Sequence, residues 1–532
     1  MISKVLIIVP PLVNLDEQAG SVSDQPEYEA FRLVSPVEPT TVAANLLKRG
    51  FHVKLFDLGT YVFQDRFKHL ERALEAFRPE AVVVVQSILT FSTAQDWDGK
   101  RVFDLARATR PDVVTILTGN NATNYPGQAV KADICQYSIR GEVDFAVGEL
   151  LSALNASGDL SALPGLSYRA ASGEVATDEN YPVVDVATLP IPAYHLLEPE
   201  QKTQYATTLE RAKIRFPEKS PHYRDILTSR SCILRCAFCS VAYLRGERQK
   251  YRRKPLELVM AEIESALADG IEEIHFFDDL FAQNEAQILE FTAEIKRRRL
   301  TFHWFVGQGM PLWPLTPRAL EAMVEAGMYR VIAPFESGSN RVLKEVVGKV
   351  YSTVEHHHNV IQWIHELGIE LLGLFVIGMP GEQRQEILET VRFAEAHPDI
   401  DYSIFSIATP MVGTRLMKRV TREGRLGDED KINRVIKRTV ALYETDAFKA
   451  YEMGVIRTFD WDRINFPTLE RKVKYARMVG LTLEQLDNVR DHSKKTFYRF
   501  FPDYDGPRSF EELYHQPALF EALEPVIPSS LY

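Results

Sequence analysis

Short apolar runs alternate with amphipathic stretches along the first 150 residues of the chain. Each run is continuous, which is typical of strands that are covered on both faces. Strands alternating with helices of this length imply right-handed crossovers and a parallel sheet. The chain is therefore expected to have an α/β fold that begins with a doubly wound, Rossmann-like domain. The predicted strands span 5–9, 53–56, 81–85 and 113–117, with a strand edge near 138, and the predicted helices span 40–49, 67–77 and 101–109.

Small and polar residues stand where four of these strands end. Parallel sheets bind ligands in the crevice beyond the carboxyl ends of their strands, and glycine lets the backbone approach a large ligand closely. These loops are therefore the candidate binding surface of the first domain. They are Pro10-Pro11, Gln86-Ser87, Gly119-Asn120-Asn121 and Gly141-Glu142.

The composition changes over residues 151–220, which we interpret as a linker with a hairpin at 173–185. Strand–helix alternation then resumes over 221–428, and a mainly helical domain is predicted over 429–532, after a first domain at 1–150. The six predicted strands of the middle domain lie at 226–228, 273–277, 302–306, 331–335, 371–377 and 402–407. The predicted helices of the last domain lie at 432–443, 469–479 and 483–495, joined by aromatic loops such as 458–466.

Composition and charge narrow the possible classes of protein. The chain has 532 residues, of which 45% are hydrophobic and 25% charged, as in ordinary globular proteins. A net charge of −11 argues against a nonspecific nucleic-acid surface, which would be basic. The apolar run near the amino terminus has only five residues, too few for a signal peptide or a membrane span. We therefore expect a cytoplasmic enzyme without a membrane span.

Three of the four cysteines, Cys232, Cys236 and Cys239, form a C-x3-C-x2-C pattern. Thiolates select iron–sulfur clusters, zinc or copper(I), and a structural zinc site usually has four protein ligands. The remaining cysteine, Cys135, lies about a hundred residues upstream. A 4Fe–4S cluster held by three thiolates leaves one iron free for another ligand. The alternatives are a zinc knuckle and three core cysteines, since cysteine is often buried as a small hydrophobe.

The cysteine pattern and the strand ends that follow it resemble the radical S-adenosylmethionine (SAM) superfamily. In that family SAM binds the open iron through its amine and carboxylate, and an electron from the cluster cleaves SAM to a 5′-deoxyadenosyl radical. From the residues alone, the aspartates after the second strand equally suit a helix cap, and the serine after the fourth equally suits a helix start. The resemblance implies a partial (βα)6 barrel and SAM contacts from Phe238, Asp278, Asp279, Glu336, Ser337 and Gly378.

A doubly wound domain before the three cysteines resembles the cobalamin-binding domain that precedes many radical SAM domains. Methionine synthase and the mutases carry Asp-x-His-x-x-Gly after the first strand, where the histidine binds cobalt. This chain has Asp16-Glu-Gln18-Ala-Gly20 there, so no histidine is expected on the lower cobalt face. The other interpretation is a doubly wound domain without a ligand, because one fold hosts many functions. The resemblance implies cobalamin contacts from Pro10, Pro11, Gln86, Ser87, Thr90, Gly119, Asn120, Asn121, Gly141 and Glu142.

Together these resemblances imply a cobalamin-dependent radical SAM enzyme similar to the class B methyltransferases. Such an enzyme moves a methyl group from methylcobalamin to an unactivated carbon or phosphorus of a small-molecule biosynthetic intermediate. A flavodoxin- or ferredoxin-like protein is the expected electron donor. Ring contraction and oxidative cyclisation use the same architecture and stay open as alternatives. A cobalamin- or cluster-dependent regulator is a third alternative, which the SAM-strand signatures disfavour.

Three other features have competing interpretations. His356-His357-His358 suggests a metal site, but adjacent helical side chains point about 100° apart, so we expect a solvated helix surface. The basic run at 245–254 suits a solvated loop better than a contact with an anionic substrate or with the partner domain. Trp461, Asp462 and Arg463 suit either a pocket in a cap over the barrel or simple packing.

Overall fold

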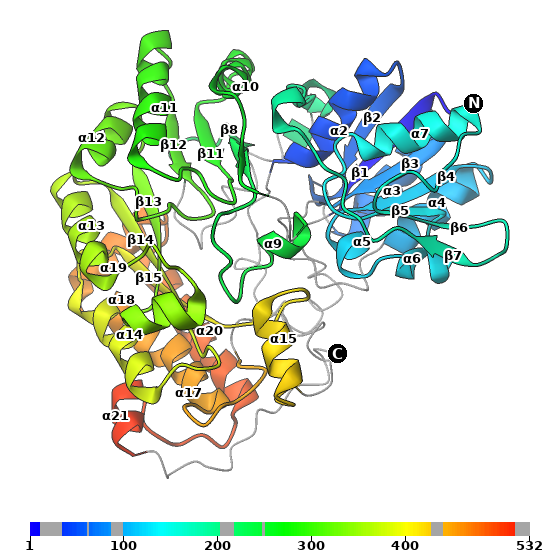
Figure 1. Cartoon of the computed structure of the whole chain (residues 1–532). Helices are drawn as coiled ribbons and strands as arrows, with labels where there is room; N and C mark the ends of the chain where they lie inside the picture. The colour runs from blue at the N-terminus through cyan, green and yellow to red at the C-terminus, as the bar shows by residue number, and fades with distance from the viewer. Residues whose placement is uncertain are drawn as a thin grey trace. The chain divides into compact units, whose positions relative to one another are not determined.

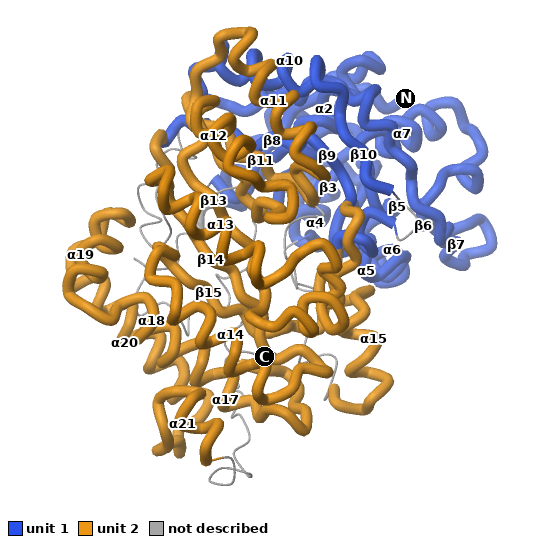
Figure 2. Tube along the Cα trace, turned by 60° about the vertical axis from the view of Figure 1, so that its left-hand side comes forward, with its two compact units in different colours: residues 1–211, 221–231, 241–271 blue, residues 212–220, 232–240, 272–532 orange. Residues whose placement is uncertain are grey.

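The computed structural model describes residues 1–10, 35–60, 63–86, 99–199, 201–202, 218–246, 250–426 and 440–516. These residues form two compact units, which Figure 2 colours separately. Unit 1 comprises Met1–Arg211, Pro221–Ser231 and Val241–Ile271, and unit 2 comprises Ala212–Ser220, Cys232–Ser240 and Glu272–Tyr532. The four-part division expected from the sequence stays a prediction.

Unit 1 is built on a seven-stranded sheet in the order β2-β1-β3-β4-β5-β6-β7 (Figure 1). The first five strands pair in parallel, whereas β6 and β7 pair antiparallel. The hairpin expected at 173–185 is formed slightly earlier by β6 and β7, and it extends the sheet instead of standing in a linker. The strands are β1 (Lys4–Val9), β2 (His52–Asp57), β3 (Ala81–Val85), β4 (Val114–Thr118), β5 (Tyr137–Ile139), β6 (Leu166–Arg169) and β7 (Val175–Thr177).

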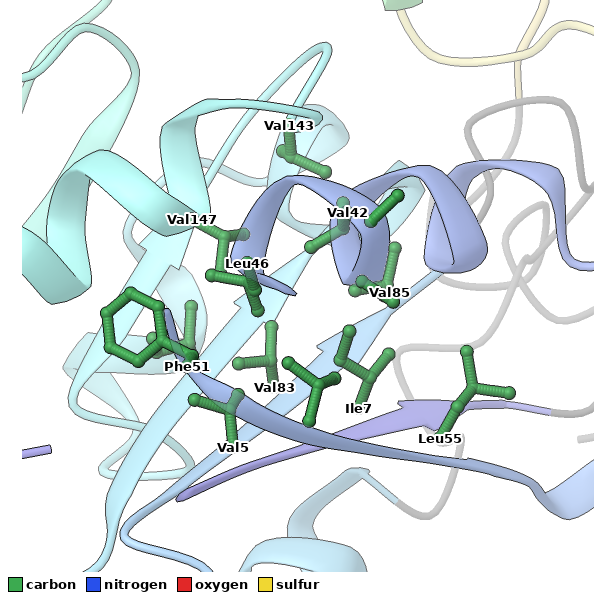
Figure 3. Close-up of a cluster of buried hydrophobic side chains, with 14 of the residues drawn as sticks. Val5, Ile7, Val42, Leu46, Phe51, Leu55, Val83, Val85, Val143 and Val147 are labelled. Carbon is green, nitrogen blue, oxygen red and sulfur yellow. The ribbon is translucent and has the colours of Figure 1, made fainter. Parts of the chain in front are cut away.

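Apolar residues cover both faces of this sheet, as the continuous runs predict. In β1, Val5 and Ile7 pack on one face and Leu6 and Ile8 on the other, and all four are fully buried. Helices α2 and α7 cover the first face, which Figure 3 shows, and α3 and α4 cover the second. The helices are α2 (Val37–Lys48), α3 (Phe63–Phe77), α4 (Gly99–Thr109), α5 (Asn120–Asn124), α6 (Gln128–Lys131) and α7 (Ala146–Ala156).

The rest of unit 1 flanks the cysteine loop in the sequence. β9 and β10 form a short antiparallel pair on either side of that loop in the chain. The N–H of Lys254 donates to the carbonyl of Thr228 over 2.8 Å and continues this pairing. The elements are β8 (Tyr223–Ile226), β9 (Ser229–Arg230), α9 (Val241–Leu244), β10 (Arg252–Arg253) and α10 (Leu256–Ala268), with short 3₁₀ turns η2 (Leu58–Thr60), η3 (Val186–Thr188) and η4 (Tyr194–Leu196).

Unit 2 repeats a strand–helix unit five times. Strands β11 and β12 pair in parallel, and β13, β14 and β15 form a second parallel sheet. A parallel bridge between Trp304 and Met328 brings β12 alongside the residues that precede β13. The strands are β11 (Glu273–Phe276), β12 (His303–Val306), β13 (Arg330–Glu336), β14 (Glu370–Ile377) and β15 (Tyr402–Ile407), and the helices are α11 (Glu285–Arg298), α12 (Pro317–Glu325), α13 (Val354–Glu366), α14 (Arg384–Ala396) and α15 (Arg415–Arg422).

Aromatic side chains join each sheet of unit 2 to its helices. Phe335, Phe375 and Phe405 come from three adjacent strands, and the rings stack in sequence with centroids 5.6 Å and 5.3 Å apart. Phe393 of α14 packs against the first two. Helix α14 therefore packs on the face of the strands that carries these rings. The α/β fold class is confirmed.

The carboxyl-terminal part of unit 2 is helical, as expected, but two boundaries differ. The predicted helix at 432–443 lies outside the described residues up to 439, and its last four residues are not helical. The aromatic loop predicted at 458–466 is helical as far as Asn465. The helices are α17 (Ala450–Val455), the π-helical η6 (Ile456–Asp460), α18 (Trp461–Asn465), α19 (Leu469–Met478), α20 (Leu483–Phe500) and α21 (Phe510–His515), and a further π-helix, η5, spans Val342–Val347. Among the described helices, none is long and apolar enough to cross a membrane.

Candidate functional site

The three cysteines lie on one short loop that the backbone holds in place. The N–H of Ala237 donates to the carbonyl of Val347 over 2.8 Å, and the carbonyl of Ala237 accepts the N–H of Leu416 over 2.8 Å. The N–H of Cys239 donates to the carbonyl of Cys236 over 3.1 Å, which closes a turn between the last two cysteines. The backbone groups that hold this loop therefore belong to two other parts of unit 2, at Val347 and Leu416.

A glycine turn packs against the cysteine loop. Gly348 has a φ of +89°, and a Cβ added there would lie 2.6 Å from the guanidinium of Arg415. The same guanidinium donates a hydrogen bond to the carbonyl of Arg235 within the loop. A side chain at position 348 would displace this contact, and the positive φ itself favours glycine.

The thiols of Cys232 and Cys236 are protonated in the absence of a metal. Burial raises the pKa of Cys232 to about 12. Burial also raises the pKa of Cys236 to about 11, against the opposing charge of Lys349. A metal that binds here must displace these protons. Within the described residues, no three His, Cys, Asp or Glu side chains are grouped tightly enough to hold a single ion. A single ion draws its ligands to one point, whereas the three thiolates of a 4Fe–4S cluster bind three separate irons.

A buried ion pair stands beside these thiols. The Nζ atom of Lys349 lies 2.9 Å from Oε1 of Glu336, and the two residues are 5% and 6% exposed. Lys349 also donates to the carbonyl of Pro334 over 2.7 Å. Its charge lowers the pKa of both Cys232 and Cys236 against the effect of burial. The carboxylate of Glu336 acts in the opposite direction and raises the pKa of Cys236. The pair therefore places a positive and a negative charge within electrostatic range of Cys236.

Glu336 has a strained backbone at the carboxyl end of β13. Its φ is +63°, a region that residues with a side chain seldom occupy. The pairing of β13 with β14 shifts register between Pro334 and Glu336. Strain of this kind persists only where the surroundings enforce it. The irregularity turns the Glu336 carboxylate toward Lys349.

The aspartate pair follows β11, as predicted. Asp278 is 1% exposed, and Asp279 is partly buried. The charge of Asp279 raises the pKa of Cys232, so its carboxylate lies within electrostatic range of that thiol. Phe238 lies in a turn of the cysteine loop and is partly buried. The structure thus brings Asp279 and Phe238 to the cysteines, and their contacts with SAM stay predictions.

Ser337 is engaged inside the protein. Its hydroxyl shares a 2.9 Å hydrogen bond with the hydroxyl of Thr390 and accepts the N–H of Ser339 over 3.1 Å. The side chain is fully buried. These bonds are those of the helix-start alternative, and a SAM contact by this hydroxyl stays a prediction.

Gly378 directly follows β14 with a φ of +79°, and its neighbours come from the helical part of unit 2. A Cβ added there would lie 3.2 Å from Sδ of Met453. The hydroxyl of Tyr443 donates to the Gly378 carbonyl over 2.6 Å. Four residues later Glu382 is 3% exposed and accepts the N–H of Met379. Burial raises the pKa of Glu382 to about 8, so this carboxyl is largely protonated at neutral pH.

In unit 1, the loops after β3 and β4 are brought together. The N–H of Asn121 donates to Oε1 of Gln86 over 2.9 Å. A Cβ added at Gly119 would lie 1.7 Å from the Gln86 carbonyl oxygen, so only glycine fits. Within the described residues, Nε2 of Gln86 makes no hydrogen bond and is available as a donor to a ligand. Asn120 is buried and accepts a hydrogen bond from Nδ2 of Asn124.

The other predicted cobalamin contacts are placed only in part. The N–H of Gly141 donates to the hydroxyl of Thr123 in α5 over 2.8 Å. Pro10 ends β1 and is partly buried. The remaining candidates, Pro11, Ser87 and Thr90, lie outside the described residues, as does the loop from Asp16 to Gly20.

Glu142 belongs to a buried network of carboxylates and arginines within unit 1. Its two carboxylate oxygens accept hydrogen bonds from Arg252 over 2.8 and 2.9 Å, and one also accepts from Arg245 over 3.3 Å. Asp144 forms a two-point pair with Arg230, with N–O distances of 2.6 and 2.7 Å. All of these side chains except Arg252 are almost fully buried. A cobalamin contact by the Glu142 side chain stays a prediction.

The expectation of a solvated loop at 245–254 is wrong for its buried cations. Arg245 and Arg252 bind Glu142, and Lys254 pairs with Glu262 at 2.5 Å with both side chains buried. Their carboxylate partners lie 8 to 110 positions away in the chain. Spacing along the sequence therefore gave no sign of the pairing.

Comparison with known proteins decides the class of this site. Residues 226–394 match the model of the radical SAM superfamily. The chain carries a radical SAM domain. It is an enzyme, and the predicted 4Fe–4S cluster and SAM agree with this domain. The match includes the three cysteines and every residue predicted to contact SAM.

Curated relatives extend the likeness beyond the radical SAM domain. An uncharacterized methyltransferase of Pyrococcus horikoshii is 27% identical over 78% of this chain and 82% of the relative. Cytidylyl-2-hydroxyethylphosphonate methyltransferase of Streptomyces wedmorensis is 26% identical over 76% of this chain and 81% of the relative. The anaerobic magnesium-protoporphyrin IX monomethyl ester cyclase of Rubrivivax gelatinosus is 25% identical over 65% of this chain and 60% of the relative.

Two solved structures show the same fold. The radical SAM methyltransferase TsrM of Kitasatospora setae, solved with cobalamin and a 4Fe–4S cluster, matches with a TM-score of 0.61 and 20% identity over 80% of this chain and 78% of TsrM. The cobalamin-dependent radical SAM enzyme OxsB matches with a TM-score of 0.67 and 15% identity over 95% of this chain and 74% of OxsB. The expected likeness to cobalamin-dependent radical SAM methyltransferases is confirmed.

Sequence reasoning missed Lys349 in the radical SAM domain. The one available signal was a lysine directly after Gly348 in an otherwise apolar stretch. The histidine triplet also differs from expectation, because His357 is fully buried between Phe335 and Phe393. Burial lowers the pKa of His357 to about 3, so it is a neutral core residue, whereas His358 is exposed.

The aromatic and charged residues after the radical SAM domain pack internally. Trp461 is 5% exposed and donates through Nε1 to the hydroxyl of Tyr402 over 3.0 Å. Asp462 pairs with Arg490, and Arg463 pairs with Asp460 at 2.7 Å. Of the two interpretations left open by the sequence, these contacts are those of packing.

Proposed function

We propose that the chain is a cobalamin-dependent radical SAM methyltransferase. It transfers a methyl group to an unactivated carbon or phosphorus of a small-molecule biosynthetic intermediate. The proposal is supported by the radical SAM match and by two relatives that carry the name methyltransferase and align over about four-fifths of their length. A flavodoxin- or ferredoxin-like donor and a reducing cytoplasm complete the proposal.

The observation that carries the proposal is the cysteine loop with its neighbouring cation. Three soft ligands on one loop, with a distant fourth cysteine, suit a cluster that keeps one iron open. When bound, the cluster supplies the electron that cleaves SAM, and cobalamin supplies the methyl group. The backbone bonds of Ala237 orient the loop. Lys349 opposes the negative charge that the three thiolates carry once their protons leave.

The described part of the first domain also suits cobalamin. The corrin ring and its tail present many amide and phosphate acceptors. Nε2 of Gln86 is a donor held in a fixed direction, because its partner atom Oε1 is bonded to the N–H of Asn121. The tight approach at Gly119 keeps the neighbouring backbone close to the sheet edge. In this proposal Gln86 and the loop from Gly119 to Asn121 hold part of the cofactor.

The proposal is tested with anaerobically reconstituted protein, SAM, methylcobalamin and dithionite. The wild type is expected to bind about four irons per chain and to form 5′-deoxyadenosine. With extracts that contain the substrate, it is expected to form S-adenosylhomocysteine as well. Cys236→Ala should lose both the cluster absorbance and the products, whereas Cys135→Ala should keep them, because Cys135 is buried in the core of unit 1. Product formation by Cys236→Ala would refute the proposal.

The second candidate is a non-methylating reaction of the same cofactors. The likeness to the ester cyclase of Rubrivivax gelatinosus supports it. Ring contraction or oxidative cyclisation would yield 5′-deoxyadenosine without a matching amount of S-adenosylhomocysteine. A regulator would yield neither. Mass spectrometry of the two nucleosides in one assay therefore separates all three outcomes.

A further inference from the structure

One partly exposed arginine in the helical part of unit 2, Arg457, has no counter-ion among the described residues. Arg457 takes part in no ion pair or hydrogen bond within the described residues, and its Nε is buried without a partner. Burial lowers the pKa of this guanidinium. Arginine stays charged in proteins, so this guanidinium is a cation whose Nε–H is shielded from water and unpaired.

Two carboxylates of the same helical run are engaged elsewhere. Glu452 forms a two-point pair with Arg384, with N–O distances of 2.9 and 2.5 Å. Asp460 accepts from Arg463 over 2.7 Å and from the N–H of Phe510 over 2.9 Å. Neither of them can rotate toward Arg457 without leaving another buried group unpaired. Within the described residues, Arg457 is therefore left without a carboxylate partner.

The position of Arg457 on its helix is set by its neighbours four residues away on each side. Helices α17, η6 and α18 run without a break from residue 450 to 465, and residues four apart share a face. Met453 lies against Gly378 at the carboxyl end of β14, and Trp461 donates to Tyr402 at the start of β15. Arg457 therefore lies between them, on the face that η6 turns toward β15.

Two further features mark this position as a ligand site. Arg457 belongs to the π-helical segment η6, and short π-helical insertions are frequent at functional sites. Met453 is four residues from Arg457, about 6 Å along a helix axis, and it adjoins the strand end expected to contact SAM. The residue also keeps some exposure, so a small ligand can reach it.

We propose that Arg457 binds an oxyanion group of the substrate, a carboxylate or a phosphoryl group. A guanidinium matches both through two parallel hydrogen bonds. The inference rests on the proposed function, and it narrows the substrate to an acidic small molecule. SAM also carries a carboxylate, so the test must separate these two sources of the same chemistry.

The test compares Arg457→Gln with the matched control Arg422→Gln, which removes an exposed arginine. The probe is inorganic phosphate, titrated calorimetrically into the reconstituted holoenzyme at constant ionic strength. Wild type and Arg422→Gln are expected to bind phosphate equally, and Arg457→Gln at least tenfold more weakly. Arg457→Lys keeps the charge without the planar fork and is expected to lie between them. If Arg457→Gln does not fold, the phosphate affinity of Arg457→Lys is compared with that of wild type instead. Equal phosphate affinity of wild type and the position-457 variants would overturn the inference.

A second titration with SAM identifies the source of the anion. The affinity for SAM is expected to be the same in wild type and in the position-457 variants. A tenfold loss of SAM affinity would assign Arg457 to the SAM carboxylate and overturn the assignment to substrate. Failure of the proposed function has a different signature, because wild-type protein would then form no 5′-deoxyadenosine from SAM and dithionite, whatever the phosphate result.

Discussion

Replacing Asp144 by asparagine is expected to destabilise unit 1 strongly, because it removes the charge that neutralises Arg230. Asp144 and Arg230 are both 2% exposed in their side chains and are joined by two short hydrogen bonds. Removing one partner of a buried ion pair costs about 3–5 kcal/mol. Glu142 lies 3.7 Å from Arg230 and compensates in part. We therefore expect the low end of this range, about 3 kcal/mol of unfolding free energy.

The assay is the thermal unfolding temperature of the full chain at pH 7. For units of this size, 1 kcal/mol corresponds to about 2–4 °C, so Asp144→Asn should lower the midpoint by about 6–12 °C. The matched control is Asp133→Asn, which breaks a 2.7 Å pair with Arg169 whose side chains are 80% and 43% exposed. Exposed pairs contribute about 0–1 kcal/mol, and asparagine tolerates the left-handed backbone of Asp133. Asp133→Asn should therefore lower the unfolding midpoint by at most a few degrees.

The pH of the assay follows from the titration of Asp144. Burial opposes ionisation of this carboxyl, but the charge of Arg230 more than reverses that effect and holds its pKa below the ordinary value of 3.8. A depressed pKa contributes stability that is present above the unfolded value and lost as the pH falls through the folded value. The difference between wild type and variant is therefore fully developed at pH 7 and should shrink in strong acid.

A second variant separates the unpaired charge from a general loss of packing. If the cost of Asp144→Asn comes from the unpaired guanidinium, adding Arg230→Met should restore much of the lost stability. The reasoning fails if Asp144→Asn shifts the midpoint no more than Asp133→Asn. It also fails if the double variant is less stable than Asp144→Asn alone.

Three further predictions address other parts of the chain. Lys349→Met should lower 5′-deoxyadenosine formation by about tenfold or more, because it leaves Glu336 as an unpaired buried carboxylate beside the thiols. The control Lys344→Met, at an exposed position, should leave this rate unchanged. Equal rates of the two variants would contradict the role of the pair. Wild-type stability should fall as the pH rises from about 5 to about 8, because folded Glu382 keeps its proton up to a pKa of about 8. The thermal midpoint of Glu382→Gln should depend less on pH over this range. The same pH slope in wild type and variant would refute this role of Glu382. Gly119→Ala should unfold at a lower temperature and lose cobalamin binding, because its Cβ would meet the Gln86 carbonyl at 1.7 Å. The control Gly173→Ala, where no atom lies within 4 Å, should lower the free energy of unfolding by about 1 kcal/mol. Similar unfolding temperatures and cobalamin binding in both variants would contradict this prediction.

The sequence predicted the parallel sheets well, because a strand buried on both faces is apolar at every position. The run at 81–85 coincides with β3 (Ala81–Val85), and 402–407 coincides with β15 (Tyr402–Ile407). The helical segment at 458–465 was predicted as a loop. It packs against β15 on one side and α20 on the other, so it lacks the single apolar face that reveals a helix. Its polar residues are paired in the interior and gave no periodic signal.

The candidate site was predictable where its chemistry is local in the sequence. The three cysteines, Phe238 and the aspartate pair each follow from a short motif. Lys349 and the network around Glu142 were not predictable, because each pairing joins residues from separate elements. A lone lysine or arginine in the sequence does not indicate whether it is solvated or buried against a carboxylate.

The strain at Glu336 links the fold to the chemistry of the site. A left-handed backbone at a residue with a side chain costs about 1–3 kcal/mol, and glycine at this position would remove that cost. The chain instead holds the strained conformation from several sides. Phe335 is fully buried, Ser337 is bonded to Thr390, and the Glu336 carboxylate is bonded to Lys349. These contacts fix a carboxylate and an ammonium group beside the cysteine loop, where neither is needed to cover apolar surface. The charge of Lys349 lowers the pKa of Cys236, whereas that of Glu336 raises it, so the strained carboxylate serves to hold the ammonium group in place.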